Sequence, residues 1–105
     1  MIMKSQFAVV YQFEVIRGKE QEFQESWEKM TELIYMHEGS LGSRLHKEKE
    51  QTYIAYAQWP SREKWENYGK NMPKEAEAIG DQMRRACTKI ETLFQLNTVS
   101  DLLRL

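Results

Sequence analysis

The sequence predicts an α+β domain in which helices cover one face of a four-stranded antiparallel sheet. Four segments alternate apolar and polar residues, and this period of two is typical of strands. The segments between them space their apolar residues by three or four positions, which is typical of amphipathic helices. The elements follow in the order strand, helix, strand, strand, helix pair, strand, which is the order of the ferredoxin-like split βαβ arrangement.

The first strand and the first helix occupy residues 6–39. The strand, residues 6–16, places β-branched and aromatic side chains on one side and ends at the turn Arg17-Gly18. From Lys19 the period lengthens, and acidic residues fill the early turns, where the helix dipole favours negative charge. Gly39 is the expected end of the helix. Its apolar line consists of Phe23, Trp27, Met30, Leu33 and Ile34.

Two further strands form a hairpin over residues 41–59. The polar stretch 47–52 is the expected loop between them. Pro60 stops the second of these strands, because proline cannot donate a hydrogen bond to a neighbouring strand.

A helix pair and a last strand complete the domain. Ser61 is the expected N-cap of the first of these helices, and Pro73 interrupts it. A further helix begins at about residue 74, and residues 90–96 alternate as the fourth strand. The apolar edge of the helix before Pro73 consists of Trp65, Tyr68 and Met72.

The two faces of the predicted sheet differ in chemistry. One face is apolar enough to receive the helices, whereas the other mixes charged and apolar side chains. The helix-facing set is Phe7, Val9, Tyr11, Phe13, Val15, Leu41, Leu45, Tyr53, Ala55, Ala57, Trp59, Ile90, Phe94 and Leu96. The mixed set is Ala8, Val10, Gln12, Glu14, Arg44, His46, Ile54, Tyr56, Gln58, Glu91, Leu93 and Gln95.

The mixed face favours a second copy of the chain, packed sheet against sheet by two-fold symmetry. The alternative is a solvated face with scattered apolar residues, which is common in antiparallel sheets. The tail after residue 97 favours the dimer, because its aliphatic residues are difficult to leave in water. Those residues are Val99, Leu102, Leu103 and Leu105. The dimer-face candidates are Gln12, Glu14, Arg44, His46, Tyr56 and Gln58.

Small side chains lie opposite large ones where the helices meet the sheet. Ser43, Ala55 and Ala57 are small strand residues, and the helices opposite carry tryptophan, tyrosine and methionine. In one interpretation the bulky groups fill the space by ordinary interdigitation. In the other, the space is a cavity for a flat aromatic ligand. The ligand-pocket candidates are Trp27, Tyr53, Trp59, Trp65, Tyr68 and Met72.

Composition excludes several classes of function. The chain has 105 residues, enough for one domain, and its 15 basic and 16 acidic residues give a net charge of −1. That balance produces no field to attract nucleic acid or an anionic membrane, so neither is an expected partner. The beginning of the chain lacks the apolar run of a signal peptide, and no apolar stretch approaches a membrane span. Cytoplasmic residence is therefore expected.

Motifs for catalysis are nearly absent. His37 and His46 do not have metal-ligand spacing, so no metal site is expected. Neither glycine cluster follows a GxGxxG or P-loop pattern, so no cofactor is expected. His46 is the better functional candidate because it lies beside Arg44, although an interface role is favoured for it. Cys87 is the single cysteine and has no partner for a disulfide. The sequence alone identifies no catalytic residue.

Three segments resemble the antibiotic biosynthesis monooxygenase (ABM) superfamily. They are RGKEQEF at residues 17–23, GSLGSRLH at residues 39–46 and YAQWPSREKW at residues 56–65. The resemblance implies a dimeric α+β barrel made of two copies, with ligand pockets between sheet and helices. We expect residues 1–97 to form the ABM-like domain and residues 98–105 to form an apolar tail, which either crosses to the dimer partner or folds back on its own chain.

The resemblance also implies a reaction class. Some members oxidise polycyclic phenols or quinols with molecular oxygen, without metal or flavin, and their tyrosine, tryptophan and asparagine side chains handle protons. Here Tyr68, Trp65 and Tyr53 are the nearest equivalents. The haem-degrading branch is disfavoured, because no histidine follows His46. The expected function is thus a cofactor-independent, monooxygenase-like action on a small aromatic or quinol-type molecule, and the alternative is a non-catalytic binding or structural homodimer.

Overall fold

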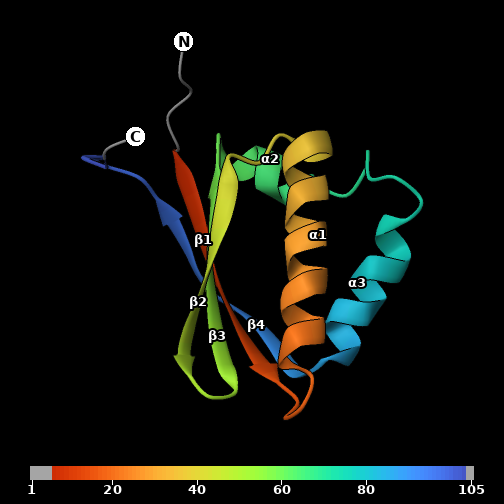
Figure 1. Ribbon diagram of the computed structural model, residues 1–105. Helices are drawn as coiled ribbons and strands as arrows, with labels where there is room; N and C mark the ends of the chain where they lie inside the picture. Colours follow the sequence, from red (N-terminus) through yellow and green to blue (C-terminus); the bar gives the residue numbers. More distant parts are fainter. Residues whose placement is uncertain (1–5, 104–105) are drawn as a thin grey trace.

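A computed structural model describes residues 6–103 of the chain and shows one sheet with helices packed on one of its faces (Figure 1). Residues 1–5 of the expected domain and residues 104–105 of the expected tail lie outside the described residues. In chain order the elements are β1 (Phe7–Val15), α1 (Glu20–Glu38), β2 (Gly42–Lys49), β3 (Thr52–Trp59), α2 (Arg62–Glu66), α3 (Ala76–Arg85) and β4 (Cys87–Asn97).

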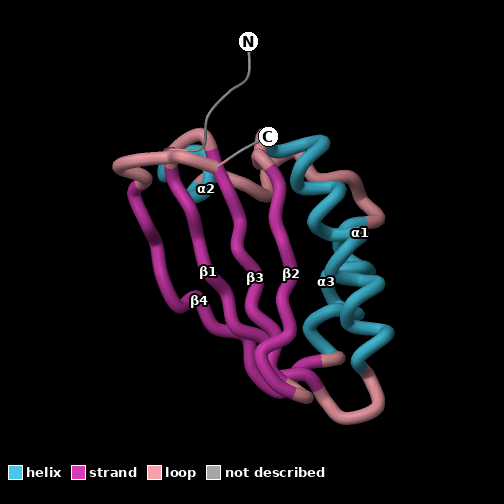
Figure 2. Tube along the Cα trace, turned by 60° about the vertical axis from the view of Figure 1, so that its left-hand side comes forward, coloured by secondary structure: helices cyan, strands magenta, loops and turns pink. Residues whose placement is uncertain are grey.

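The described strands form a four-stranded antiparallel sheet in the order β2-β3-β1-β4. Figure 2 shows α1 and α3 on the same side of this sheet, while the opposite face, called the open face below, carries no helix formed by the described residues. The predicted α+β, ferredoxin-like fold class is therefore confirmed. Among the described residues, no helix combines the length and the apolar character needed to cross a membrane.

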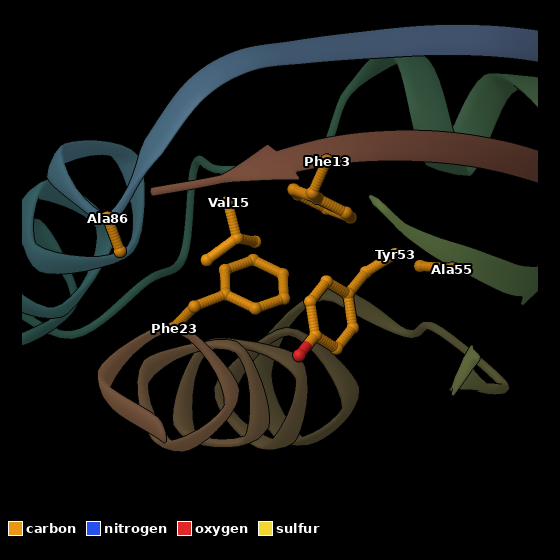
Figure 3. Packing of buried hydrophobic residues seen from close by; sticks show 6 residues of the cluster. All are labelled: Phe13, Val15, Phe23, Tyr53, Ala55 and Ala86. Carbon is orange, nitrogen blue, oxygen red and sulfur yellow. The ribbon is translucent and has the colours of Figure 1, made fainter. Parts of the chain in front are cut away.

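The core lies between β1, β3 and the helices. Phe23 of α1 is fully buried, with its ring centroid 5.0 Å from that of Phe13 and 5.2 Å from that of Tyr53 (Figure 3). A second cluster, at the other end of the sheet, joins strand residues of β1 and β3. The first cluster consists of Phe13, Val15, Phe23, Tyr53, Ala55 and Ala86, and the second of Phe7, Val9, Ala57 and Trp59.

The ends of α1 and α2 follow their local sequence. Gly39 ends α1 with φ 82°, a left-handed conformation that glycine adopts without steric cost. Ser61 caps α2, because its hydroxyl accepts a hydrogen bond from the Lys64 N–H at 3.2 Å. However, α2 ends at Glu66 and does not continue toward Met72 as the apolar edge predicted. Gly69, with φ 108°, lies in the loop that follows and is incompatible with a continuous helix.

A β-bulge in β4 corrects the predicted faces of this strand. Thr92 pairs with Tyr11 and Phe94 pairs with Val10, so Leu93 is an extra residue on β4. One extra residue moves every following side chain to the other face. Phe94 and Leu96 therefore lie on the open face, with exposed fractions of 58% and 44%.

The same bulge brings Gln95 to the helix side of the sheet, although the sequence placed it on the mixed face. There its side-chain oxygen accepts a hydrogen bond from Arg62 Nη1 at 2.6 Å, and the Arg62 guanidinium also lies 4.7 Å from the Phe7 ring centroid. The open face consequently gains two large apolar side chains and loses one amide. The strand itself begins at Cys87, three residues earlier than predicted.

Candidate functional site

A cavity of about 320 Å³ lies between the sheet and the helices. Ser43, Ala55 and Ala57 form part of its wall on β2 and β3, and their small side chains leave space that the helices do not fill. The full lining is Tyr11, Phe13, Trp27, Met30, Thr31, Ile34, Ser40, Ser43, Ala55, Ala57, Trp59, Tyr68, Met83, Arg84 and Ile90. The walls are thus mainly aromatic and aliphatic, which is typical of a site for a small apolar ligand.

Solvent-exposed residues mark the mouth of the cavity. Tyr68 is 42% exposed and Ile90 is 41% exposed, whereas the wall residues Ala55 and Trp59 are almost fully buried. Arg84 of α3 is also largely exposed, and its Nη2 donates to an oxygen of Asp81 at 2.6 Å. The cavity is therefore closed by the sheet at one side and reaches solvent between α3, β4 and the loop after α2.

The loop that carries Tyr68 is tied to the end of α1. Glu38 is buried, and its carboxylate accepts hydrogen bonds from the Asn71 backbone N–H at 2.8 Å and from the Asn71 amide at 3.4 Å. The ring of Tyr68 lies 5.5 Å from the ring of Trp59, measured between centroids. These contacts hold the Tyr68 side chain against the cavity wall, although Tyr68 lies beyond the end of α2 and no helix positions it.

Tyr11 of β1 and Trp65 of α2 form a hydrogen-bonded pair beside the cavity. Trp65 Nε1 donates to the Tyr11 hydroxyl oxygen at 2.7 Å, and the Trp65 ring packs on Phe7 at 5.7 Å. Burial raises the pKa of Tyr11 to about 12, and the hydrogen bond from Trp65 opposes part of this shift. Partial burial also raises the pKa of Tyr68, and the positive charge of Arg84 opposes this second shift. Both phenols are therefore neutral at physiological pH.

Trp59 contributes a buried polar atom without a partner. Its Nε1 is inaccessible to solvent and has no hydrogen-bond partner within residues 6–103. A buried N–H without an acceptor costs roughly 1–3 kcal/mol, so each instance calls for an explanation. Trp59 lies in the cavity wall under Tyr68, which makes a ligand acceptor one such explanation.

Comparison with known proteins assigns the fold to a family. The family model described as antibiotic biosynthesis monooxygenase matches residues 6–86, about three quarters of the chain. The chain belongs to the ABM family. The resemblance in the three sequence segments is thereby confirmed.

Solved structures share this ABM fold along nearly the whole chain. A mutant of SnoaB, a cofactor-independent oxygenase from Streptomyces nogalater, superposes with a TM-score of 0.75 at 16% identity, covering 96% of this chain and 100% of its own. A proposed antibiotic biosynthesis monooxygenase from Caulobacter crescentus gives a TM-score of 0.71 at 21% identity, covering 93% of both chains. Rv0793 from Mycobacterium tuberculosis gives 0.72 at 12% identity, covering 94% of this chain and 100% of its own. No curated protein matches the sequence significantly.

The structure of this ABM protein brings three of the six ligand-pocket candidates together. Trp27, Trp59 and Tyr68 line the cavity from α1, β3 and the loop after α2. Tyr53 instead packs on Phe23 and lines a separate groove beside β2. Trp65 reaches the cavity only through Tyr11, and Met72 is not among the lining residues.

Twelve of the fifteen lining residues were not among the candidates, and two of the twelve, Tyr11 and Arg84, carry ionisable groups. The sequence predicted Tyr11 only as a core residue of the first strand and predicted no role for Arg84. A signal for Tyr11 was present, because a tyrosine in an otherwise apolar strand needs a partner for its hydroxyl. The location of Arg84 at the mouth depends on how α3 packs, and no local pattern indicates it.

The dimer-face candidates share the open face of the sheet. The register aligns Arg44, Tyr56, Val10 and Phe94 in one row across the four strands. In a further row, Thr52 Oγ1 donates a hydrogen bond to the Glu14 carboxylate, with oxygen–oxygen distances of 2.9 and 3.0 Å. By the same register, this face carries Gln12, Glu14, Arg44, His46, Tyr56 and Gln58.

The other polar candidates lie apart from the cavity. His37 is exposed in the last turn of α1, and His46 is exposed on β2. Burial raises the pKa of the Cys87 thiol to about 11, which disfavours the reactive thiolate. Within residues 6–103, no group of three His, Cys, Asp or Glu side chains is placed to hold a metal ion.

Proposed function

We propose that this ABM-family protein binds a small aromatic molecule of the phenol or quinol type in the cavity and oxidises it with molecular oxygen, without a cofactor. The observation that carries the proposal is the cavity itself, about 320 Å³ in volume and walled by Trp27, Trp59 and Tyr68. Ligand pockets in proteins typically span about 300–1,000 Å³, so the volume suits a small flat molecule. The cofactor-independent oxygenase activity of SnoaB, which shares the fold, also supports it.

The proposed reaction is balanced by the substrate and oxygen alone. A phenol and one O₂ give a quinone and one water, and a quinol and one O₂ give a hydroxyquinone and one water. In each case one oxygen atom enters the ring product and the other leaves as water, while the substrate supplies all the electrons. The protein binds the ring, excludes bulk water and stabilises the charge that develops on the ring oxygen.

The residues lining the cavity limit how a proton can be removed. Among the described residues, no carboxylate and no imidazole lines it, and its ionisable groups are Tyr11, Tyr68 and Arg84. Both tyrosines have raised pKa values, so neither is a base near neutral pH. The substrate therefore enters as the phenolate. The rate of oxidation should rise with pH according to the pKa of the substrate.

The absence of a base among the lining residues also favours a second candidate function. A site with hydrogen-bond donors and no base is well suited to holding a ligand without converting it. In that case the protein is a binding module for the same class of aromatic molecule.

Oxygen uptake separates the two functions. Purified protein is mixed with a panel of naphthohydroquinones and phenols, and O₂ consumption is followed with an electrode while quinone formation is followed by absorbance. The oxygenase predicts one O₂ consumed per quinone formed, with a rate above that of an equal amount of Trp59→Ala protein. Ligand-induced thermal stabilisation without O₂ consumption would instead establish the binding module. Neither stabilisation nor uptake across the panel would reject both.

We also propose that two copies of the chain pair through the open face. Five large apolar side chains are exposed on β4 and on the tail, and the tail runs beside Tyr56 of the open face. They are Phe94, Leu96, Val99, Leu102 and Leu103. So many large apolar side chains on one side of a single chain are typical of a protein–protein interface. A two-fold partner would cover them with the same surface.

Light scattering at micromolar concentration tests the pairing. The wild type should have twice the chain mass of 12.6 kDa, and Phe94→Glu should have the chain mass, because it would bury an unpaired charge. Tyr35→Glu is the matched control, since Tyr35 of α1 is 57% exposed on the helix side, close to the 58% of Phe94. A wild type with the mass of one chain would reject the dimer.

A further inference from the structure

The Tyr11 hydroxyl has a proton to donate, and no group of the described residues receives it. Trp65 Nε1 is a donor only, so in their 2.7 Å hydrogen bond the Tyr11 oxygen accepts. The hydroxyl hydrogen must therefore point elsewhere. Within residues 6–103 the structure offers it no acceptor.

The surroundings of this hydroxyl point to the cavity. Tyr11 lines the cavity, and an ionised Tyr68, which lines it too, would raise the pKa of Tyr11. The Tyr11 and Tyr68 hydroxyls thus lie close enough for the charge of one to affect the pKa of the other. Tyr68 in turn lies over Trp59, whose Nε1 is buried without an acceptor among the described residues. The cavity wall therefore carries two donors, the Tyr11 hydroxyl and Trp59 Nε1, and an acceptor oxygen on a ligand could pair with the Tyr11 hydroxyl.

We infer that Tyr11 is the residue that selects ligands bearing an acceptor oxygen, and that Trp65 is the positioning residue that orients its hydroxyl toward the ligand. This inference rests on the proposed function, because it requires an aromatic ligand in the cavity. Trp65 holds one lone pair of the Tyr11 oxygen, which restricts the rotation of the O–H bond. The donor is thereby aimed before the ligand arrives, and less orientational freedom is lost on binding.

Hydrogen bonding to a carbonyl or phenolate oxygen separates ligands that share one carbon skeleton. 1-Indanone and indane are suitable probes, because they differ only by the carbonyl and neither reacts with the Cys87 thiol. In water both hydrogen-bond partners are already solvated, so the net gain from one such bond is roughly a factor of two to ten in affinity. The affinity for indane reports apolar contacts with the cavity alone. The affinity for 1-indanone reports the same contacts together with the hydrogen bond from the donor.

Calorimetric titration of both probes into wild type, Tyr11→Phe and Trp65→Phe tests the inference. In place of Tyr11, phenylalanine keeps the phenyl ring and removes only the O–H. In place of Trp65 it keeps an aromatic side chain but removes the indole N–H together with the pyrrole ring. In Tyr11→Phe, the preference for 1-indanone over indane should fall by roughly two- to tenfold, while indane affinity stays within a factor of two. Trp65→Phe should lose part of that preference. The double variant should lose no more than Tyr11→Phe alone, because both changes act through one hydroxyl.

Infrared spectroscopy of bound 1-indanone gives a readout that a merely structural role would not move. A hydrogen bond weakens the C=O bond, so its stretching frequency should be lower in wild type than in Tyr11→Phe, with Trp65→Phe between them. If Tyr11→Phe does not fold, the difference in C=O stretching frequency between wild type and Trp65→Phe alone tests the inference. Equal preference and equal frequency in the folded proteins would overturn the role of Tyr11 and leave the ligand cavity intact. Failure of the wild type to bind either probe would overturn both.

Discussion

Replacing Ala57 by leucine should stabilise the protein, because the added side chain enters empty space. Ala57 is buried on β3 and its side of the strand faces the cavity. Leucine adds three carbons, and each buried carbon contributes about 0.8 kcal/mol. Fixing the leucine rotamer costs about 0.5–1 kcal/mol. The net gain in the free energy of unfolding is therefore about 1.5 kcal/mol.

Thermal unfolding measures this gain directly. A domain of 105 residues has an unfolding entropy near 2.1 cal/mol/K per residue, so about 1.5 kcal/mol corresponds to a rise in Tm of about 7 °C. Urea titration at 25 °C should show a higher midpoint with an unchanged slope. The same substitution should weaken indane binding, because the leucine takes up part of the ligand volume.

Ala86 is the matched control for this experiment. It is fully buried in the cluster around Phe23 and does not line the cavity. Leucine there has no space to enter and should cost about 1–3 kcal/mol through overpacking. A loss of stability in Ala57→Leu similar to that in Ala86→Leu would refute the reasoning. It would show that bulky side chains fill the helix–sheet interface by ordinary interdigitation, which is the alternative interpretation of the small strand residues.

Three further changes test the core, the backbone and the buried phenol. Phe23→Ala should cost about 3–5 kcal/mol in urea unfolding, because the ring is fully buried, and a loss below about 1 kcal/mol would contradict the core assignment. Gly39→Ala should cost about 1 kcal/mol from its φ of 82°, whereas Gly80→Ala inside α3 should be neutral or stabilising because only the flexible Arg84 side chain crowds the new methyl group. Equal effects at the two glycines would contradict the left-handed end of α1. The pKa of Tyr11 is raised from 10.0 to about 12, so the folded protein retains this proton after the unfolded chain has lost it. Stability should therefore fall as pH rises from about 10 to about 12, and unfolding midpoints of Tyr11→Phe should show a smaller fall over that window.

The long periodic elements were predictable from sequence because each is governed by local patterns. Alternation identified β1 and β3, the spacing of apolar residues identified α1, and Gly39 marked its end. The bulge at Leu93 was not predictable, because β4 carries apolar residues at both even and odd positions. Phe94 and Leu96 then fit either face, and only the pairing with β1 decides between them.

The candidate site was predictable in part for a related reason. Trp27, Trp59 and Tyr68 come from separate elements, and residue type alone marked them as wall residues for an aromatic ligand. The distance between α1 and the sheet determines whether space remains between them, and no local pattern encodes that distance. The hydrogen bond from Trp65 to Tyr11 joins residues 54 positions apart, so it too appears only in the folded chain.

A crystal structure of the protein with 1-indanone tests the ligand cavity most directly. We predict density for the ring between Trp27, Trp59 and Tyr68, with its carbonyl oxygen within hydrogen-bond distance of the Tyr11 hydroxyl. Side chains of the protein occupying that space, with no ligand density there at saturating 1-indanone, would contradict the cavity and with it the proposed function.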